Sequence, residues 1–430
     1  MGFLPSPFPS QKLSHEDDSE YGFQSNHSNP KHSDSSSSST SSTYNSSLHS
    51  QPSLPSVPSL SQPNPPSAAA HHSCIATLKG HTSYIFSLTI ADDKHLYSGS
   101  SEGEIRLWSR HNTNGIHDPI QNIESPRNGS VKSLAVSGGK VFSAHHDSKI
   151  RVWKMKNETG VNRNFECVAT LPTLSDRFCR IFSSKNYVQV RRHRKSTWVH
   201  HVDAVSALTI SHDGSLLYSA SWDRTFKVWQ TSDFRCLDSV LNAHDDAINA
   251  IVVSVDGFVY TGSADKKIKA WRFKKEQSQH ELVATLEKHK SAINALALST
   301  DGSILYSGAC DRSIIVWEKD MNKTADNHMV VAGALRGHTR AILCLSTVGS
   351  TDLVFSGSAD KTIRIWRRGL WRDYSCVAVM AGHGGPVKCL AACKDSLRSN
   401  STISGGDNYV VYSGSLDCDI REWKIWLPVI

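Results

Sequence analysis

Short apolar segments alternate with polar turns along most of this chain, and one arrangement of them recurs. In Val354–Trp366 (V-F-S-G-S-A-D-K-T-I-R-I-W), two alternating segments flank a turn that contains Asp360. This pattern predicts two β-strands joined as a hairpin. A third predicted strand, Ile342–Leu345, follows a histidine, and a fourth precedes the histidine, as in Leu282–Leu286. The predicted unit is four short strands.

The unit occurs seven times, because seven tryptophans each have an acid six residues earlier and a hydroxyl residue ten residues earlier. Six units also contain a preceding histidine, which stands 21 or 22 residues before the acid or, in the last unit, farther away, and in five of these six the acid is aspartate. The five complete sets are His201, Ser219, Asp223 and Trp229; His244, Thr261, Asp265 and Trp271; His289, Ser307, Asp311 and Trp317; His338, Ser356, Asp360 and Trp366; and His383, Ser413, Asp417 and Trp423.

Four strands in roughly 40 to 50 residues is the repeat of a propeller blade, and on these residues the chain resembles the WD40 repeat family. The resemblance extends from Ser73 to the C-terminus and implies an all-β, seven-bladed propeller over residues 73–430. Only seven residues follow Trp423, so the last repeat supplies three strands. We expect the N-terminal strand Cys74–Leu78 to complete that blade, which closes the ring and leaves no open sheet edge.

The first two repeats depart from the pattern. Glu102 replaces Asp in the first repeat and is one methylene longer. The second repeat has Arg127 where the histidine is expected, and an arginine cannot accept a hydrogen bond. We therefore expect the second blade to be held differently, by the insertion that follows it.

That insertion covers about residues 172–199, between the second and third blades. Leu174, Phe178 and Phe182 share one face of a predicted helix, with Arg177 and Arg180 on another face. Residues 187–190 are predicted to be extended. The sequence leaves open whether 167–171 or 196–199 forms the outer strand of the second blade.

Composition separates the first 72 residues from the rest. They contain 22 serines, 10 of the 15 prolines and none of the 11 tryptophans. Such a segment buries too little apolar surface to offset its chain entropy, so we expect a disordered Ser/Pro-rich tail. Its net charge of −3 leaves +10 for the propeller in a chain whose total is +7. The basic character therefore belongs to the predicted propeller.

The recurring His, Ser and Asp residues have the composition of a hydrolase triad. A catalytic site occurs once, however, whereas this set recurs in blade after blade. In the WD40 family, which this chain resembles, these residues and the tryptophan form a hydrogen-bonded structural network within each blade. We therefore expect no catalytic residues and no enzyme activity. The ten cysteines show no metal-ligand spacing, so we expect no metal and no cofactor.

The residues that precede the acids are the first candidates for partner binding. Trp222 and His146 stand out among them, because an exposed tryptophan is a typical interface anchor. The alternative is that Trp222 packs under the insertion. Basic residues of the insertion are further candidates for steering an acidic or phosphorylated partner, namely Arg177, Arg180, Arg191, Arg192, Arg194 and Lys195. The run 191–195 is also compatible with a solvated hairpin tip or a nuclear import signal.

These observations favour a non-enzymatic interaction scaffold or adaptor that binds other proteins. The Ser-rich tail, S-C-I-A-T-L-x-G-H-x-x-x-I-F-S-L and N-Y-V-Q-V-R-R-H-R-K together resemble the plant WD-repeat group called Jingubang. This resemblance implies regulation of pollen germination, with a transcription factor as partner. Nucleic-acid binding is less favoured, because the charge is modest and no base-stacking motif is visible. A cullin ligase receptor is also less favoured, because no repeat tryptophan is followed by Asp.

The sequence also yields expectations about location and assembly. No apolar run of 18 residues is present, so we expect no membrane span. Cysteines without a disulfide framework favour reduced thiols in the cytoplasm or the nucleus. We expect the propeller to be monomeric.

Overall fold

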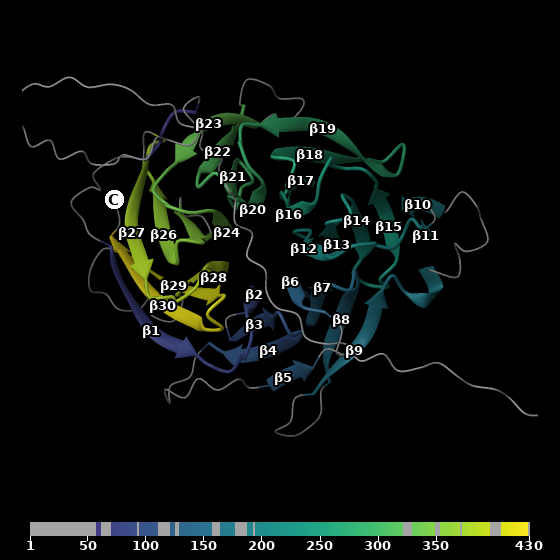
Figure 1. The fold of residues 1–430 in the computed structure, drawn as a ribbon, viewed down its shortest axis with the longest axis horizontal. Helices are drawn as coiled ribbons and strands as arrows, with labels where there is room; N and C mark the ends of the chain where they lie inside the picture. The colour runs from purple at the N-terminus through teal and green to yellow at the C-terminus, as the bar shows by residue number, and fades with distance from the viewer. Residues whose placement is uncertain are drawn as a thin grey trace, which may run out of the picture. The chain divides into compact units, whose positions relative to one another are not determined.

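The computed structural model describes residues 57–61, 70–92, 94–110, 121–124, 129–156, 164–176, 187–191, 194–320, 329–348, 353–369, 372–395 and 406–428. Within these residues, seven four-stranded antiparallel sheets stand around a common centre (Figure 1). The predicted seven-bladed all-β propeller is confirmed. Most of the predicted tail, residues 1–56 and 62–69, lies outside the described residues.

Each sheet is one blade, and its strands follow one another from the centre outward. Blade one contains β2 (Ile85–Ala91), β3 (His95–Ser100), β4 (Glu104–Ser109) and β5 (Gln121–Glu124). Blade two contains β6 (Val131–Ser137), β7 (Lys140–His145), β8 (Ile150–Lys156) and β9 (Asn164–Leu171). Blade three contains β12 (Val205–Ile210), β13 (Leu216–Ser221), β14 (Phe226–Gln230) and β15 (Cys236–Val240).

The next three blades repeat this order. Blade four contains β16 (Ile248–Val253), β17 (Phe258–Ser263), β18 (Lys267–Lys274) and β19 (Gln279–Glu287). Blade five contains β20 (Ile293–Leu298), β21 (Ile304–Ala309), β22 (Ile314–Lys319) and β23 (Met329–Leu335). Blade six contains β24 (Ile342–Thr347), β25 (Leu353–Ser358), β26 (Thr362–Arg368) and β27 (Tyr374–Ala381).

Blade seven joins the two ends of the propeller. Its inner strands are β28 (Val387–Lys394), β29 (Gly406–Ser415) and β30 (Ile420–Pro428), and its outer strand is β1 (His71–Leu78). β1 pairs antiparallel with β30, with Cys74 opposite Trp423. The predicted closure by the N-terminal strand is therefore present.

Apolar side chains pack between neighbouring blades. One such core joins blades five and six through Tyr306, Leu335, Val354 and Trp366, all nearly inaccessible to solvent. Blades six and seven also approach closely, because Gly357 stands between the two serines of β25 and a Cβ at that position would lie 2.7 Å from a methyl carbon of Val387 on β28. The second strands β17, β21 and β25 are buried along their whole length because each blade is covered on both faces.

Residues 57–61 lie against the propeller, although the sequence assigned them to the tail. We call this segment the strap. Leu60 donates its backbone N–H to Ala334 O on β23 (3.0 Å) and accepts from the N–H of Tyr374 on β27 (3.0 Å). The Val57 side chain is 2% exposed. The strap therefore spans the outer strands of blades five and six.

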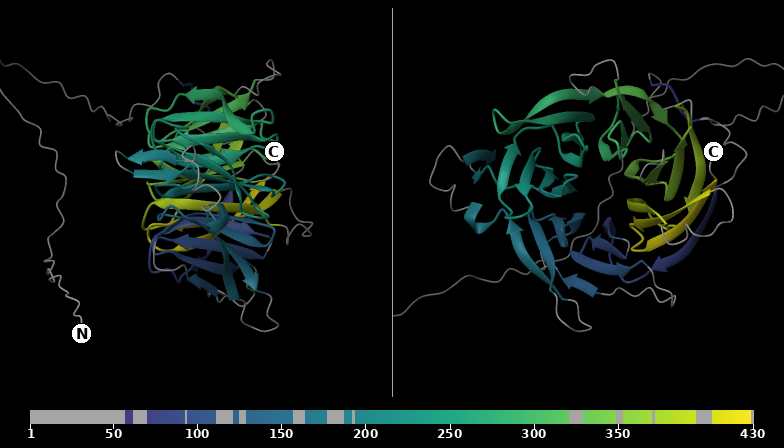
Figure 2. Two further views of the ribbon diagram at one scale, coloured as in Figure 1. Left: turned by 90° about the vertical axis from the view of Figure 1, so that its right-hand side faces the viewer. Right: turned by 180° about the vertical axis from the view of Figure 1, so that it is seen from behind.

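The insertion does not supply a blade strand. β9, not residues 196–199, pairs with β8 as the outer strand of blade two, which settles the open alternative. The backbone then forms a separate hairpin of β10 (Tyr187–Arg191) and β11 (Arg194–Thr197). Figures 1 and 2 place this hairpin outside blade three, beyond β15.

Hydrogen bonds attach the insertion to the outer strand of blade three. The backbone N–H of Cys236 donates to Asp176 Oδ2 (3.2 Å), and Ser239 Oγ donates to Trp198 O (3.3 Å). The buried ammonium of Lys227 donates to the same carbonyl oxygen (2.5 Å). The insertion thus braces blade three, whereas the sequence predicted that it braces blade two.

Only residues 174–176 of the predicted helix are described, and they are helical. The Thr173 hydroxyl accepts the backbone N–H of Asp176 at the helix start (3.2 Å). Leu174 is 68% exposed, so it does not pack the helix as predicted. Phe178 and Phe182 lie outside the described residues.

Candidate functional site

Blades three to seven each contain a complete hydrogen-bonded set of histidine, hydroxyl, aspartate and tryptophan, which we call the relay. Histidine Nδ1 lies 2.8–3.0 Å from the aspartate Oδ2, and histidine Nε2 lies 2.8–2.9 Å from the hydroxyl oxygen. The tryptophan Nε1–H donates to the same hydroxyl oxygen at 2.8–2.9 Å. The relay therefore links the loop before the inner strand to the second and third strands of one blade.

The aspartate also organises the turn that carries it. In blade six, Asp360 accepts from His338 Nδ1 (2.8 Å), from the backbone N–H groups of Thr339 and Thr362 (both 3.0 Å) and from the Thr362 hydroxyl (2.6 Å). Burial alone would raise the pKa of Asp360, but the hydrogen bonds from His338 and Thr362 hold it below its ordinary value. Burial lowers the pKa of His338, although Asp360 opposes this shift. At neutral pH, His338 is therefore neutral beside the ionised Asp360.

Blade two rebuilds its relay with a different histidine. His145, on β7, places Nε2 2.8 Å from Ser143 Oγ and Nδ1 3.1 Å from Gly129 O. Trp153 donates to the same Ser143 oxygen (2.8 Å), and Asp147 pairs with Arg151 instead of a histidine (2.6 Å). Burial, and then the charge of Arg151, lower the pKa of His145 to about 4. The expected bracing by the insertion is thus replaced by a histidine within the blade; Arg127 lies outside the described residues.

Blade one retains the histidine but has glutamate, and not aspartate, at the acid position. His81 Nε2 lies 2.7 Å from Ser98 Oγ, whereas its buried Nδ1 has no hydrogen-bond partner among the described residues. Glu102 instead accepts from the Thr82 hydroxyl (3.2 Å), and the nearest carboxylate oxygen to Nδ1 is that of Glu104, at 3.4 Å. Burial, followed by the charge of Arg106, lowers the pKa of His81 to about 3. This relay is incomplete.

The relays are not shaped as nucleophilic sites. The hydroxyl residues Ser219, Ser307, Ser356 and Ser413 have no solvent-exposed surface. Each hydroxyl oxygen already contacts both a histidine and a tryptophan. A substrate carbonyl therefore has no route to these oxygens, and the geometry serves packing and strand connection.

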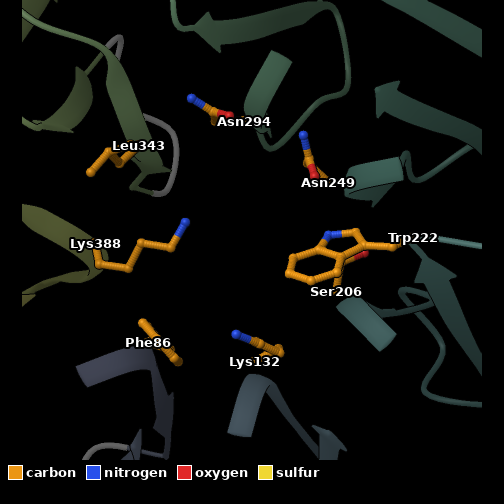
Figure 3. Close-up of a pocket in the computed structure, with 8 residues that line it drawn as sticks. All are labelled: Phe86, Lys132, Ser206, Trp222, Asn249, Asn294, Leu343 and Lys388. Carbon is orange, nitrogen blue, oxygen red and sulfur yellow. The ribbon is translucent and has the colours of Figure 1, made fainter. Parts of the chain in front are cut away.

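A pocket of about 370 Å³ lies on the axis of the ring and includes Trp222, one of the candidates for partner binding. It is lined by Phe86, Lys132, Ser206, Trp222, Asn249, Asn294, Leu343 and Lys388. All except Trp222 are the second residue of an inner strand, one from each blade (Figure 3). Ile85 at the start of β2 pairs with Ser100 at the end of β3, immediately before the acidic turn. The pocket therefore opens on the face of the acidic turns, which we call the turn face.

The structure brings Trp222 and His146 together at the edge of this pocket. Their rings meet edge to face, with centroids 5.8 Å apart. Trp222 is 37% exposed, and Lys132 Nζ lies 5.4 Å from the centre of its ring. Trp222 thus faces the mouth of the ring, whereas the insertion contacts the outer edge of blade three. The described contacts of the insertion are therefore with the outer strand of blade three and not with Trp222.

The basic candidates of the insertion are placed only in part. The backbone register puts Arg191 opposite Arg194 at the end of the β10–β11 hairpin, with Lys195 opposite Gln189. Arg177, Arg180 and Arg192 lie outside the described residues. The structure therefore locates part of this basic run on a hairpin end at the rim.

Sequence reasoning did not identify the pocket, because its lining residues share a position and not a residue type. The signal is nevertheless present: each lining residue except Trp222 occupies the site immediately after the apolar residue that begins an inner strand. Among the described residues, no group of three His, Cys, Asp or Glu side chains could hold a metal ion. The described parts of the chain also contain no helix long and apolar enough to cross a membrane.

Comparisons with known proteins agree with this architecture. The chain is 26% identical over 228 residues to a guanine nucleotide-binding protein subunit beta from Nicotiana plumbaginifolia, which covers 47% of this chain and 60% of that protein. It is 23% identical over 176 residues to the ribosome biogenesis protein YTM1 of Eremothecium gossypii, covering 37% and 38% respectively. It is 22% identical over 204 residues to the kinesin-like protein KIF21B of Mus musculus, covering 46% and 10%. The chain thus spans less than two thirds of each of these relatives.

The family model described as WD domain, G-beta repeat matches residues 72–109, 193–230, 235–272, 280–318, 329–367 and 374–424. The matched segments omit the tryptophan strand of blade two, where the relay uses His145. They cover more than half of the chain and contain the tryptophan of every other blade. On this match and on the propeller itself, the chain belongs to the WD40 repeat family.

Proposed function

We propose that the protein is a non-enzymatic interaction scaffold that binds a partner protein at the turn face. The observation that carries this proposal is the axial pocket, where the partly exposed Trp222 lies beside His146 and Lys132. Aromatic side chains next to a recess are typical anchors of protein interfaces. The buried relay hydroxyls favour a structural role over a catalytic one.

The resemblance to the Jingubang group makes the proposal more specific. On that basis we propose a regulator of pollen germination in the cytoplasm or the nucleus, with a transcription factor among its partners. One relative is named as a subunit of a guanine nucleotide-binding protein, which supports assembly with other chains as a use of this fold. The proposal for this chain does not extend to that relative's own partners.

Capture experiments with matched variants test the scaffold proposal. Proximity labelling and pull-down should recover a reproducible partner set with the intact chain, and Trp222→Ala should lose part of it. Phe273→Ala is the matched control, because Phe273 is a similarly exposed aromatic residue (44%) near the opposite end of a blade strand. Equal capture by both variants would contradict binding at the pocket.

A second variant tests the rim separately. Removal of 174–195 deletes the helical turn and most of the β10–β11 hairpin, while the pocket residues remain. If the insertion is the recognition element, this deletion removes partners that Trp222→Ala retains. If the insertion only braces blade three, the deletion lowers the melting temperature and leaves the partner set unchanged.

A further inference from the structure

We propose that the axial pocket binds an anionic side chain on an extended segment of the partner, with its charge between Lys132 and Lys388. This inference rests on the proposed scaffold function and specifies the chemistry that its pocket recognises. Around the ring, Lys388 of blade seven, Phe86 of blade one and Lys132 of blade two are consecutive pocket residues. Figure 3 shows both lysine side chains extending into the pocket on the side that holds Phe86.

The two ammonium groups concentrate uncompensated positive charge. None of the eight lining residues is acidic. Burial, and then the charge of Lys388, lower the pKa of Lys132, and no described carboxylate opposes these effects. Two like charges at one site disfavour each other, so an anion between them relieves that repulsion. The charge of the pocket therefore favours an acidic group.

Aromatic rings hold one lysine in position. Lys132 Nζ lies 4.3 Å from the centre of the Phe86 ring and 5.4 Å from the centre of the Trp222 ring. Such cation–π contacts fix the ammonium group without neutralising its charge. The same rings offer apolar surface to the carbon atoms of an incoming side chain.

On the opposite side of the pocket, two asparagine side chains form hydrogen bonds between neighbouring blades. Asn249 Nδ2 donates to Ile293 O (2.9 Å), and Asn294 Nδ2 donates to Ile342 O (2.8 Å). Each asparagine thus links its own inner strand to that of the next blade. One N–H of each amide is used in this way, and the amide oxygen can accept a hydrogen bond from the partner, for example from a backbone N–H. The pocket therefore has a cationic side and an acceptor side, which suits a peptide carrying one acidic side chain.

Binding of defined peptides by the full-length chain tests the inference directly. The probes are fluorescent peptide pools that are identical except for a central phosphoserine, glutamate or serine, with inorganic phosphate as a competitor. We expect the phosphoserine or glutamate pool to bind at least about tenfold more tightly than the serine pool. Lys132→Gln/Lys388→Gln should abolish this preference, and Lys132→Arg/Lys388→Arg should retain it.

Charge-matched controls separate a local effect from net charge. Lys154 and Lys275 are exposed and lie near strand ends remote from the acidic turns, so Lys154→Gln/Lys275→Gln should keep the preference. Thermal melts should show that all three double variants fold. Equal affinity for the three pools, or an unchanged preference in Lys132→Gln/Lys388→Gln, would overturn the inference. Competition by inorganic phosphate at the affinity of the peptides would also overturn it, because the site would then recognise a free ion and not a partner segment.

The outcomes also separate this inference from the scaffold proposal. If the intact chain captures no partner from cells, the scaffold proposal fails whatever the peptides show. If capture depends on Trp222 but is unchanged in Lys132→Gln/Lys388→Gln, the scaffold proposal stands and the anion inference fails alone.

Discussion

Blades two and six each contain a buried serine that is hydrogen-bonded to a histidine and a tryptophan, but the histidine comes from a different position in the two blades. In blade six, His338 reaches in from the preceding loop and joins Asp360 to Ser356. In blade two, His145 approaches the equivalent Ser143 from its own strand, and the aspartate is left to pair with Arg151. The constant requirement is a partner for the buried serine and tryptophan. The source of that partner, and the role of the acid, can change.

The largest expected difference between the two blades follows from removing the acid. Asp360→Ala should reduce the free energy of unfolding by roughly 2 to 4 kcal/mol, because it leaves the buried donors of His338 and Thr362 unpaired. Asp147→Ala should cost only about 1 kcal/mol, because Asp147 pairs with the Arg151 guanidinium, whereas Ser143 contacts only the backbone oxygen of Arg151 (3.4 Å). Urea melts of the two variants measure the difference. Equal losses would show that Asp147 supports blade two as strongly as Asp360 supports blade six.

Removing the substitute histidine tests whether blade two depends on it. His145→Ser introduces the residue that most other blades have at this position and should cost roughly 1 to 2 kcal/mol at neutral pH, because Ser143 then loses one partner. His338→Ser in blade six is the matched comparison and should cost more, since Asp360 also loses its contact. A neutral His145→Ser variant would contradict a rebuilt relay.

The same variant should change how stability depends on pH. The pKa of His145 is about 4 in the folded chain, below its ordinary value of 6.5, so the unfolded chain binds the extra proton first as pH falls. The stability that neutral His145 provides is complete above pH 6.5 and is lost as pH falls toward 4, at up to about 1.4 kcal/mol per pH unit. The cost of His145→Ser should therefore shrink over this window in melts taken at several pH values. A cost independent of pH would mean that His145 is protonated equally in both states.

The strap packs against blade six, and none of its described contacts is with blade two. Leu60 packs among the side chains between blades five and six, where Gly333 leaves room for it, because a Cβ there would meet a Leu60 carbon. Deleting residues 1–69 should cost about 1 to 2 kcal/mol relative to deleting 1–50, because Val57 and Leu60 lose their apolar contacts. Limited proteolysis of the intact chain should accordingly protect 57–61. Equal melting temperatures for the two truncations would show that the strap adds no stability.

The periodic part of the fold was predictable, because hydroxyl, acid and tryptophan recur at fixed spacings. These spacings identified the blade hairpins and left the last repeat one strand short, which predicted the closure by β1. His145 was missed because a search for a loop histidine does not examine the strand position where serine usually stands. The only indication of His145 was that the buried hydroxyl of Ser143 needs a hydrogen-bond partner.

The candidate site was predictable only in part. Trp222 and His146 were found because they differ from the residues at the same place in other repeats, and the structure brings their rings together. The pocket lining varies from lysine to phenylalanine, so no residue type marks it. The contacts of the insertion with Cys236 and Lys227 could not be predicted from the sequence, because the insertion occurs once and no other repeat shows which residues lie beside it.

The smallest expected effect concerns blade one. Like blade six it has the loop histidine, but like blade two it has no aspartate bound to that histidine. Glu102→Asp should restore the shorter acid that the other loop-histidine blades use and let it accept from His81 Nδ1, which now has no hydrogen-bond partner. We expect a gain of about 0.5 to 1 kcal/mol, the net value of one hydrogen bond. The new carboxylate contact should also raise the pKa of His81 from about 3, so less stability is lost as pH falls below 6.5. Urea melts at neutral and mildly acidic pH measure both effects, and NMR titration of His81 measures its pKa directly. A destabilised variant would show that Glu102, through Thr82, already serves this turn better than an aspartate does.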